Sequence, residues 1–148
     1  MSGNNTKEDM AVELMKSGST CAQAVISVFA DETGIEKGLA HKIMTGFGGG
    51  MGRKQYTCGT ITAGVAVLNL RYGNVDSADT EAKNLTYSKV NEFITTMENK
   101  FGHSDCRNLL GVDFTNPDES SRVKDEGLTE KVCHNVMREV VRYLEREI

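Results

Sequence analysis

Apolar side chains recur at steps of three and four residues along most of this chain, and this spacing constrains the fold more than any other feature. The clearest stripe consists of Val90, Phe93, Ile94, Met97 and Phe101. Residues at this spacing share one face of a helix, and alternation with a period of two is nearly absent. The only proline is Pro117, so little interrupts helix formation. The sequence therefore predicts an all-α fold, a single compact domain of several helices over residues 1–148.

Capping residues and glycines divide the chain into segments. The predicted helices cover about 7–16, 20–33, 36–45, 58–72, 77–101, a short turn at 106–110, and 129–148. Residues 58–72 are rich in β-branched side chains, so a strand competes there, but the segment is long for a strand. Residues 1–6 are predicted to be a flexible N-terminus. The polar segment 111–127 holds the proline and is predicted to be a surface loop.

The charge distribution excludes some classes of function. The net charge is −4, and Lys and Arg are interleaved with acidic residues. A nucleic-acid-binding domain normally carries a basic stripe, so we expect no nucleic-acid partner. Apolar runs are too short to span a bilayer, and the first residues lack the apolar core of a signal peptide. We therefore expect a cytoplasmic protein, in a reducing environment where structural disulfides are rare.

Four cysteines, Cys21, Cys58, Cys106 and Cys133, each stand at or near a predicted helix start, on the side of the apolar stripe. A helix N-terminus favours a thiolate over a thiol. No two cysteines form a Cys-x-x-Cys unit, which excludes the zinc-ribbon, thioredoxin, c-type haem and ferredoxin patterns. A shared site must therefore come from tertiary packing. It would be either a thiolate cage for a metal or a pair of exchangeable dithiols, unless each cysteine is simply a small buried apolar residue.

Basic residues near the cysteines refine this picture. Arg53 and Lys54 precede Cys58, which follows the predicted cap Thr57. Nearby cations and a helix start both lower the pKa of a thiol, so we expect Cys58 to be the most reactive of the four.

Two of the three histidines lie close to a cysteine in the sequence. His103 lies close to Cys106, and His134 is adjacent to Cys133. Either imidazole could replace a thiolate at a metal, although such residues more often are solvated side chains. His41 lies in the middle of a predicted helix and is expected at the surface.

The glycine-rich segment 46–52 must break regular structure. It follows a helix and matches neither nucleotide-binding glycine motif, so an extended helix C-cap is the simplest interpretation. Glycine also lets backbone N–H groups approach sulfur closely. We therefore expect Gly48, Gly49 and Gly50, together with Gly59, to contact any cofactor held by the cysteines.

These motifs resemble a known family, the redox-active proteins named for the motif C_GCAxxG_C_C. The resemblance rests on residues 19–25, 46–52, 57–59, 101–102, 105–107 and on Cys133, and it covers about residues 10–145. This sequence departs from the family pattern at Thr60 and Ala63, where the family has a small Ala and a Gly. The resemblance implies a redox role. A similar module accompanies haem domains in split-Soret cytochromes, where an iron–sulfur site has been suggested, and family members are linked to transporter gene neighbourhoods.

The combined prediction is a redox-active site formed by four cysteines. In the preferred version, Cys21, Cys58, Cys106 and Cys133 bind an iron–sulfur cluster or another metal, for electron transfer or redox sensing. In the first alternative the same residues are the redox thiols of a metal-free thiol–disulfide oxidoreductase. In the second they hold structural zinc in a domain that docks a transporter. The expected partner is a redox protein, a membrane transporter or its associated proteins, and a homodimer is one possible assembly.

Overall fold

The computed structural model describes residues 5–148, and helices dominate this part of the chain. The α-helices are α1 Lys7–Lys16, α2 Cys21–Val28, α3 Ala30–Thr33, α4 Lys37–Ile43, α5 Gly59–Tyr72, α6 Thr80–Phe101, α7 Cys106–Leu110, α8 Pro117–Asp125 and α9 His134–Glu147. A 3-10 turn, η1 (Thr45–Phe47), follows α4, and a π-helical turn, η2 (Thr129–Cys133), leads directly into α9. The described residues contain no strand, so the all-α prediction is confirmed.

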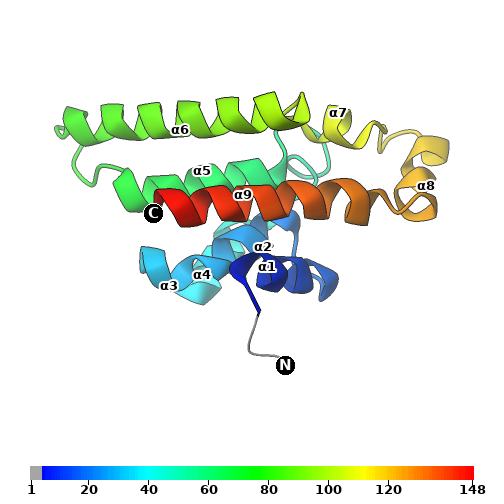
Figure 1. The fold of residues 1–148 in the computed structure, drawn as a ribbon, viewed down its shortest axis with the longest axis horizontal. Helices are drawn as coiled ribbons and strands as arrows, with labels where there is room; N and C mark the ends of the chain where they lie inside the picture. The colour runs from blue at the N-terminus through cyan, green and yellow to red at the C-terminus, as the bar shows by residue number, and fades with distance from the viewer. Residues whose placement is uncertain (1–4) are drawn as a thin grey trace.

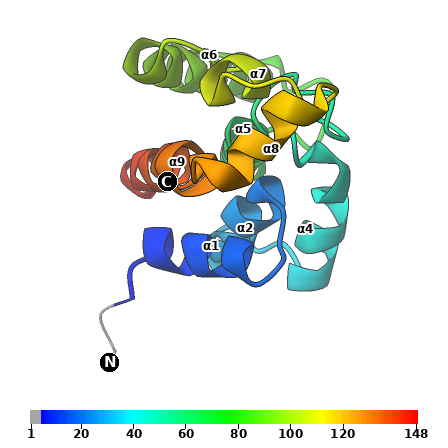
Figure 2. The same ribbon diagram turned by 90° about the vertical axis from the view of Figure 1, so that its right-hand side faces the viewer.

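The helices form three layers (Figures 1 and 2). The long helix α6 lies on one side, α5 and α9 lie side by side in the middle, and α1 to α4 form the opposite side. Helix α5 packs against α2, α6 and α9, and α1 packs against α2 and α9. The shorter helices α7 and α8 lie together at one end. The core between the layers is apolar. Its largest fully buried side chains include Ile26, Phe29, Ile61, Leu68, Phe93 and Met137.

The segment with the highest β propensity is a helix, as predicted. Helix α5 buries Ile61, Val67 and Leu68 on faces that contact the neighbouring layers. At Gly64 a Cβ atom would collide with the ring of Phe93, so glycine allows α6 to approach α5 closely.

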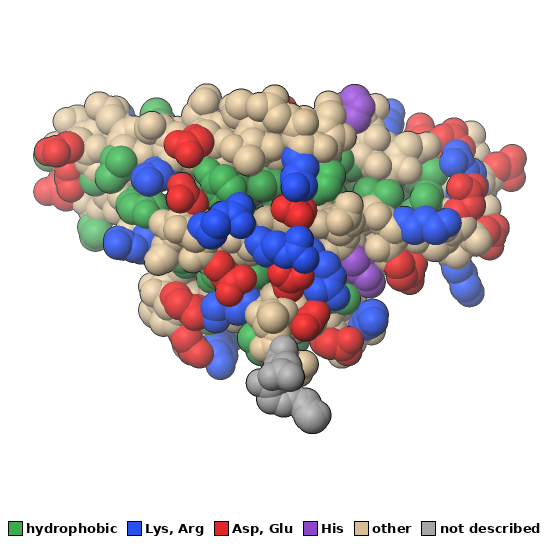
Figure 3. All heavy atoms as spheres, in the orientation of Figure 1, with side chains coloured by type: hydrophobic (Ala, Val, Ile, Leu, Met, Phe, Trp, Pro, Cys, Tyr) green, Lys and Arg blue, Asp and Glu red, His purple; other side chains and the backbone are tan. Residues whose placement is uncertain are grey.

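A cluster of ion pairs joins α1 to α9. Glu8 accepts hydrogen bonds from Arg142 (Oε2 to Nε, 2.6 Å) and from Arg138 (Oε1 to Nη1, 3.1 Å), and Arg138 also contacts Asp9 at 2.7 Å. Figure 3 shows acidic and basic side chains intermingled on this face, with no continuous basic stripe. Among residues 5–148, no helix is both long enough and apolar enough to cross a membrane.

One predicted surface loop is partly a helix in the structure. The prediction of a surface loop over 111–127 is wrong for residues 117–125, which form α8. The Asn116 side chain caps this helix by accepting from the backbone N–H of Asp118 and Glu119, and Pro117 occupies the first turn. The predicted flexible N-terminus falls mainly on residues 1–4, which lie outside the described residues. Thr6 caps α1 through the Asp9 amide.

Candidate four-cysteine site

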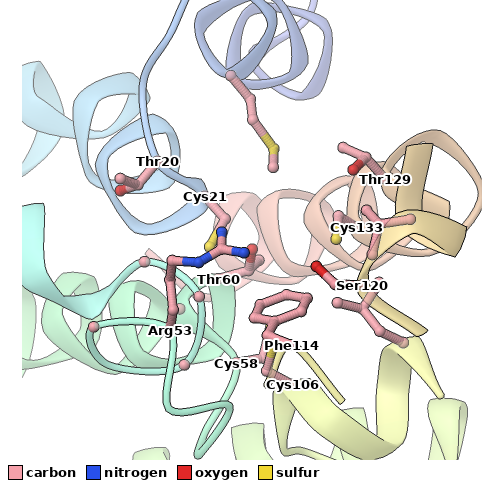
Figure 4. Close-up of a pocket in the computed structure, with 18 of the residues that line it drawn as sticks. Thr20, Cys21, Arg53, Cys58, Thr60, Cys106, Phe114, Ser120, Thr129 and Cys133 are labelled. Atoms are coloured by element: carbon pink, nitrogen blue, oxygen red, sulfur yellow. The ribbon is translucent and has the colours of Figure 1, made fainter. Parts of the chain in front are cut away.

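All four cysteines line one cavity of about 450 Å³ (Figure 4). Cys21 begins α2, Cys58 immediately precedes α5, Cys106 begins α7, and Cys133 ends η2. All four are free thiols. Tertiary packing therefore brings together cysteines that are far apart in the sequence.

A complete capping box fixes the start of α2 and with it Cys21. The Thr20 hydroxyl accepts from the Gln23 amide at 3.1 Å, and the Gln23 side chain accepts from the Thr20 amide at 2.9 Å. The side-chain Nε2 of Gln23 also donates to the His41 carbonyl at 3.1 Å and to the Thr45 hydroxyl at 3.0 Å. The start of α2 is thus tied to α4 and η1, on the glycine-rich side of the cavity.

Cys58 and Cys106 each follow one residue of an isolated β-bridge between Thr57 and Asp105. The Cys58 amide donates to the Ser104 carbonyl at 2.8 Å, and the Cys106 amide donates to the Tyr56 carbonyl at 2.7 Å. Sequence reasoning placed the cap of α5 at Thr57, but Cys58 itself is the N-cap residue. The Asp105 carboxylate caps α7 by accepting from the backbone N–H of Asn108 at 2.9 Å.

The glycine-rich segment is a left-handed loop that continues beyond the glycines. All five residues from 49 to 53 have positive φ, between 57° and 70°, and two of them are Met51 and Arg53. Backbone hydrogen bonds from Gly52 to Gly46 and from Tyr56 to Gly50 close the loop. The predicted helix C-cap does not explain five consecutive residues with positive φ. The segment is a separate loop that forms part of the cavity lining.

Two glycines allow backbone to approach other parts of the site. A Cβ atom at Gly59 would lie 2.7 Å from the Cys21 sulfur, and one at Gly48 would lie 2.7 Å from Cβ of Thr20. Only glycine permits contacts this close without displacement. All four glycines predicted to contact a cofactor line the cavity: Gly48, Gly49, Gly50 and Gly59.

Gln55 is a buried polar residue that sequence reasoning missed. Its Nε2 donates to the Val112 carbonyl at 2.9 Å and contacts the Cys106 sulfur at 3.9 Å, while its Oε1 accepts from the Phe114 amide at 2.8 Å. Its backbone is left-handed, with φ 60°. Gln55 therefore connects the glycine-rich loop to Cys106 and to the segment that follows α7.

Burial controls the electrostatics of Cys58. Desolvation raises the pKa of its thiol to about 12, and the neighbouring Cys21 adds to the increase. The backbone N–H groups of Ile61 and Thr60 oppose this shift but do not cancel it. The expectation that a helix start would make Cys58 the most acidic thiol is therefore wrong, because desolvation outweighs the helix N-terminus.

The other two shifted thiols respond in the same direction. Burial raises the pKa of Cys106 to about 11, against the hydrogen bond from Gln55. Burial also raises the pKa of Cys133, and each of the other three cysteines adds to this increase. These couplings show that the four sulfurs act on one another electrostatically. Burial thus favours the neutral thiol at Cys58, Cys106 and Cys133.

Arg53 and Thr60 also line the cavity. The Arg53 guanidinium stacks on the Phe114 ring, 4.4 Å from its centroid, and Figure 4 shows the Arg53 side chain beside the cysteines. Thr60 is only 1% exposed. Lys54, the other basic residue considered for this site, is exposed and lies outside the cavity lining.

The histidines lie elsewhere in the described structure. His41 is exposed, as expected, and contacts the Ser19 hydroxyl. His103 is exposed, and the buried His134 lines a different hollow with Lys16 and Glu130. Within residues 5–148, no group of three or more Cys, His, Asp or Glu side chains forms a ready-made site for a single metal ion.

The fold and the cavity define an all-helical protein whose four scattered cysteines share one site. Residues 19–147 match the model of the family described as "Putative redox-active protein (C_GCAxxG_C_C)", and the chain belongs to this family. No curated protein and no solved structure matches the chain significantly.

Proposed function

We propose that this protein holds an iron–sulfur cluster on Cys21, Cys58, Cys106 and Cys133 and uses it for electron transfer or redox sensing. The observation that carries this proposal is the single cavity of about 450 Å³ lined by all four cysteines. Iron–sulfur clusters are typically held by four cysteine thiolates. Membership of a redox-active family agrees with this role.

Thiolate ligands in this cavity would need a compensating positive charge. Burial and mutual repulsion keep Cys58, Cys106 and Cys133 neutral. Four thiolates could share this cavity only if positive charge compensated them, and iron would supply that charge. The backbone N–H groups at the starts of α2, α5 and α7 would further stabilise negatively charged sulfur.

Structural zinc is the less favoured occupant of this cavity. Zinc in a four-cysteine site lies about 2.3 Å from each sulfur, so the sulfurs must be close together. In residues 5–148 no three potential ligands are arranged in that way. A cluster of several iron and sulfide ions does not require the four sulfurs to surround one ion.

The raised pKa values weigh against the metal-free alternative. Thiol–disulfide exchange begins with attack by a thiolate. Burial raises the pKa of Cys58 to about 12, so its thiolate is scarce near pH 7. A dithiol oxidoreductase normally has an attacking cysteine with a lowered pKa.

Anaerobic reconstitution with ferrous iron and sulfide tests the proposal. We expect a brown protein with iron and sulfide in near-integer ratio to the chain, and a redox-dependent absorption or paramagnetic resonance signal. Each Cys→Ser variant should lose or weaken this signal, whereas Ser120→Ala, which changes the cavity lining without removing a sulfur, should retain it. A colourless protein with stoichiometric zinc would indicate a structural role, and a metal-free protein with a reducible disulfide would indicate exchange.

A further inference from the structure

The hydroxyl of Thr60 is buried without a hydrogen-bond partner. Thr60 is 1% exposed and lines the four-cysteine cavity. Among the residues that the structure describes, no group accepts from or donates to its Oγ1 atom. A buried polar group without a partner costs free energy, so such groups are rare and need an explanation.

Other helical threonines show what Thr60 lacks. Thr33, Thr86 and Thr96 each donate to the carbonyl four residues earlier, at 2.7 to 2.8 Å. For Thr60 that carbonyl belongs to Tyr56, which precedes α5 and accepts instead from the Cys106 amide at 2.7 Å. The Cys106 amide thus occupies the Tyr56 carbonyl, which would be the usual acceptor for the Thr60 hydroxyl.

Cys58 lies two residues before Thr60, and both residues line the four-cysteine cavity. Thr60 is the second residue of α5, and Cys58 is the residue that caps the helix. A neutral thiol is a weak acceptor, which agrees with the lack of a partner in the thiol form, whereas a thiolate is a strong one. Figure 4 shows Thr60 among the side chains that surround the cavity.

We propose that Thr60 is a positioning residue whose hydroxyl donates to the Cys58 sulfur when that sulfur is a thiolate ligand. This inference rests on the proposed iron–sulfur function. Hydrogen bonds to cluster sulfurs are one of the factors that set the reduction potential. A donor at this position stabilises the more electron-rich, reduced state and so raises the potential.

The test compares Thr60→Val with Thr60→Ser. Valine keeps the branched shape and removes the hydroxyl, and serine keeps the hydroxyl and removes the methyl group. The midpoint potential of the reconstituted protein is measured by anaerobic titration followed by absorption. We expect Thr60→Val to lower the equilibrium constant for one-electron reduction by up to about tenfold, equivalent to about 59 mV. Thr60→Ser should remain close to the wild-type value.

A second measurement uses the reduced, cluster-free protein. If the hydroxyl has no partner in that form, Thr60→Val should melt at a higher temperature than the wild type, and this advantage should diminish once the cluster is bound. A merely structural hydroxyl would give the opposite result in the cluster-free protein.

The outcomes separate this inference from the proposed function. A fully loaded Thr60→Val protein with an unchanged potential overturns the role of Thr60 and leaves the cluster intact. A lower melting temperature of cluster-free Thr60→Val also overturns it, because the hydroxyl then has a partner in the protein. Loss of iron from folded Thr60→Val, with Thr60→Ser fully loaded, supports it. Failure of the wild type to bind iron overturns both proposals.

Discussion

The Cα of Gly59 lies so close to the sulfur of Cys21 that a Cβ atom there would be only 2.7 Å from that sulfur. The first residue of α5 and the first residue of α2 are therefore in direct contact at the wall of the cavity. Any side chain at position 59 would have to displace Cys21 or tilt one of the two helices.

Gly59→Ala should therefore damage both stability and the site. We expect a loss of about 1–3 kcal/mol in the free energy of unfolding, typical of overpacking, together with weaker iron retention. Gly46→Ala is a suitable control, because a Cβ there has open space within 4 Å and no positive φ. Urea unfolding and iron analysis would measure the two effects. Equal behaviour of the two variants would contradict the close contact described here.

Gln55→Leu should destabilise the wall between the glycine-rich loop and α7. It leaves the Val112 carbonyl and the Phe114 amide without their side-chain partner. We expect a loss of about 2–4 kcal/mol, because two buried backbone groups lose hydrogen bonds. Hydrogen exchange at the Phe114 amide should accelerate. Asn108→Ala, which removes an exposed side-chain hydrogen bond to Asp105, should cost much less and is the control.

Met51→Gly should stabilise the protein. Met51 is 40% exposed and has φ 70°, a conformation that costs a non-glycine residue about 1 kcal/mol. Relief of this strain is partly offset by the greater flexibility of glycine in the unfolded chain, so we expect a net gain of up to about 1 kcal/mol. The control is Met10→Gly, which has nearly the same exposure, 39%, but lies in α1 and should lose about 1 kcal/mol. Thermal unfolding distinguishes the two signs.

The Glu8 carboxylate should make stability depend on pH in the acid range. Hydrogen bonds from Arg142 and then Arg138 lower the pKa of Glu8 against the opposing effect of desolvation. Its contribution is therefore fully present above the unfolded-state pKa and is lost as pH falls through the lower folded-state value. Glu8→Gln should cost about 1 kcal/mol at neutral pH, because the arginines are partly exposed and solvent screens the pairs.

Unfolding of Glu8→Gln and wild type across the pH range gives the check. The difference between them should shrink as the wild-type carboxylate becomes protonated below about pH 4. Glu13→Gln, whose partner Lys16 lies 3.6 Å away at the exposed surface, should show little effect at any pH. A constant difference for Glu8→Gln down to acid pH would rule out the ionised pair as its cause.

Local patterns predicted most of the helices because their determinants lie within a few residues. Thr6 caps α1, Thr20 caps α2 and Asp105 caps α7, each through an amide three residues later. Helix α8 was missed because it lacks an apolar stripe, even though Asn116 and Pro117 are a strong helix start. In this segment the helix-start residues were a better indicator of a helix than the spacing of apolar residues.

The site could be predicted only in part. Capping patterns correctly placed Cys21, Cys58 and Cys106 at helix starts. They carry no information about desolvation, so the low thiol pKa expected of Cys58 was wrong. Gln55 could not have been found, since its partners at Val112 and Phe114 are 57 and 59 residues away. The glycines indicated a loop, but nothing in the sequence indicated that Met51 and Arg53 would share its left-handed conformation.

The pairing of α1 with α9 affects the order of events during synthesis. Glu8 pairs with Arg142, which is synthesised 134 residues later. Cys133 immediately precedes the C-terminal helix that carries Arg142. While the ribosome is still producing the chain, α1 has no lasting partner on that side, and the cavity has three of its four sulfurs. A cofactor that requires all four cysteines can therefore be completed only after Cys133, just before the last helix, has been synthesised.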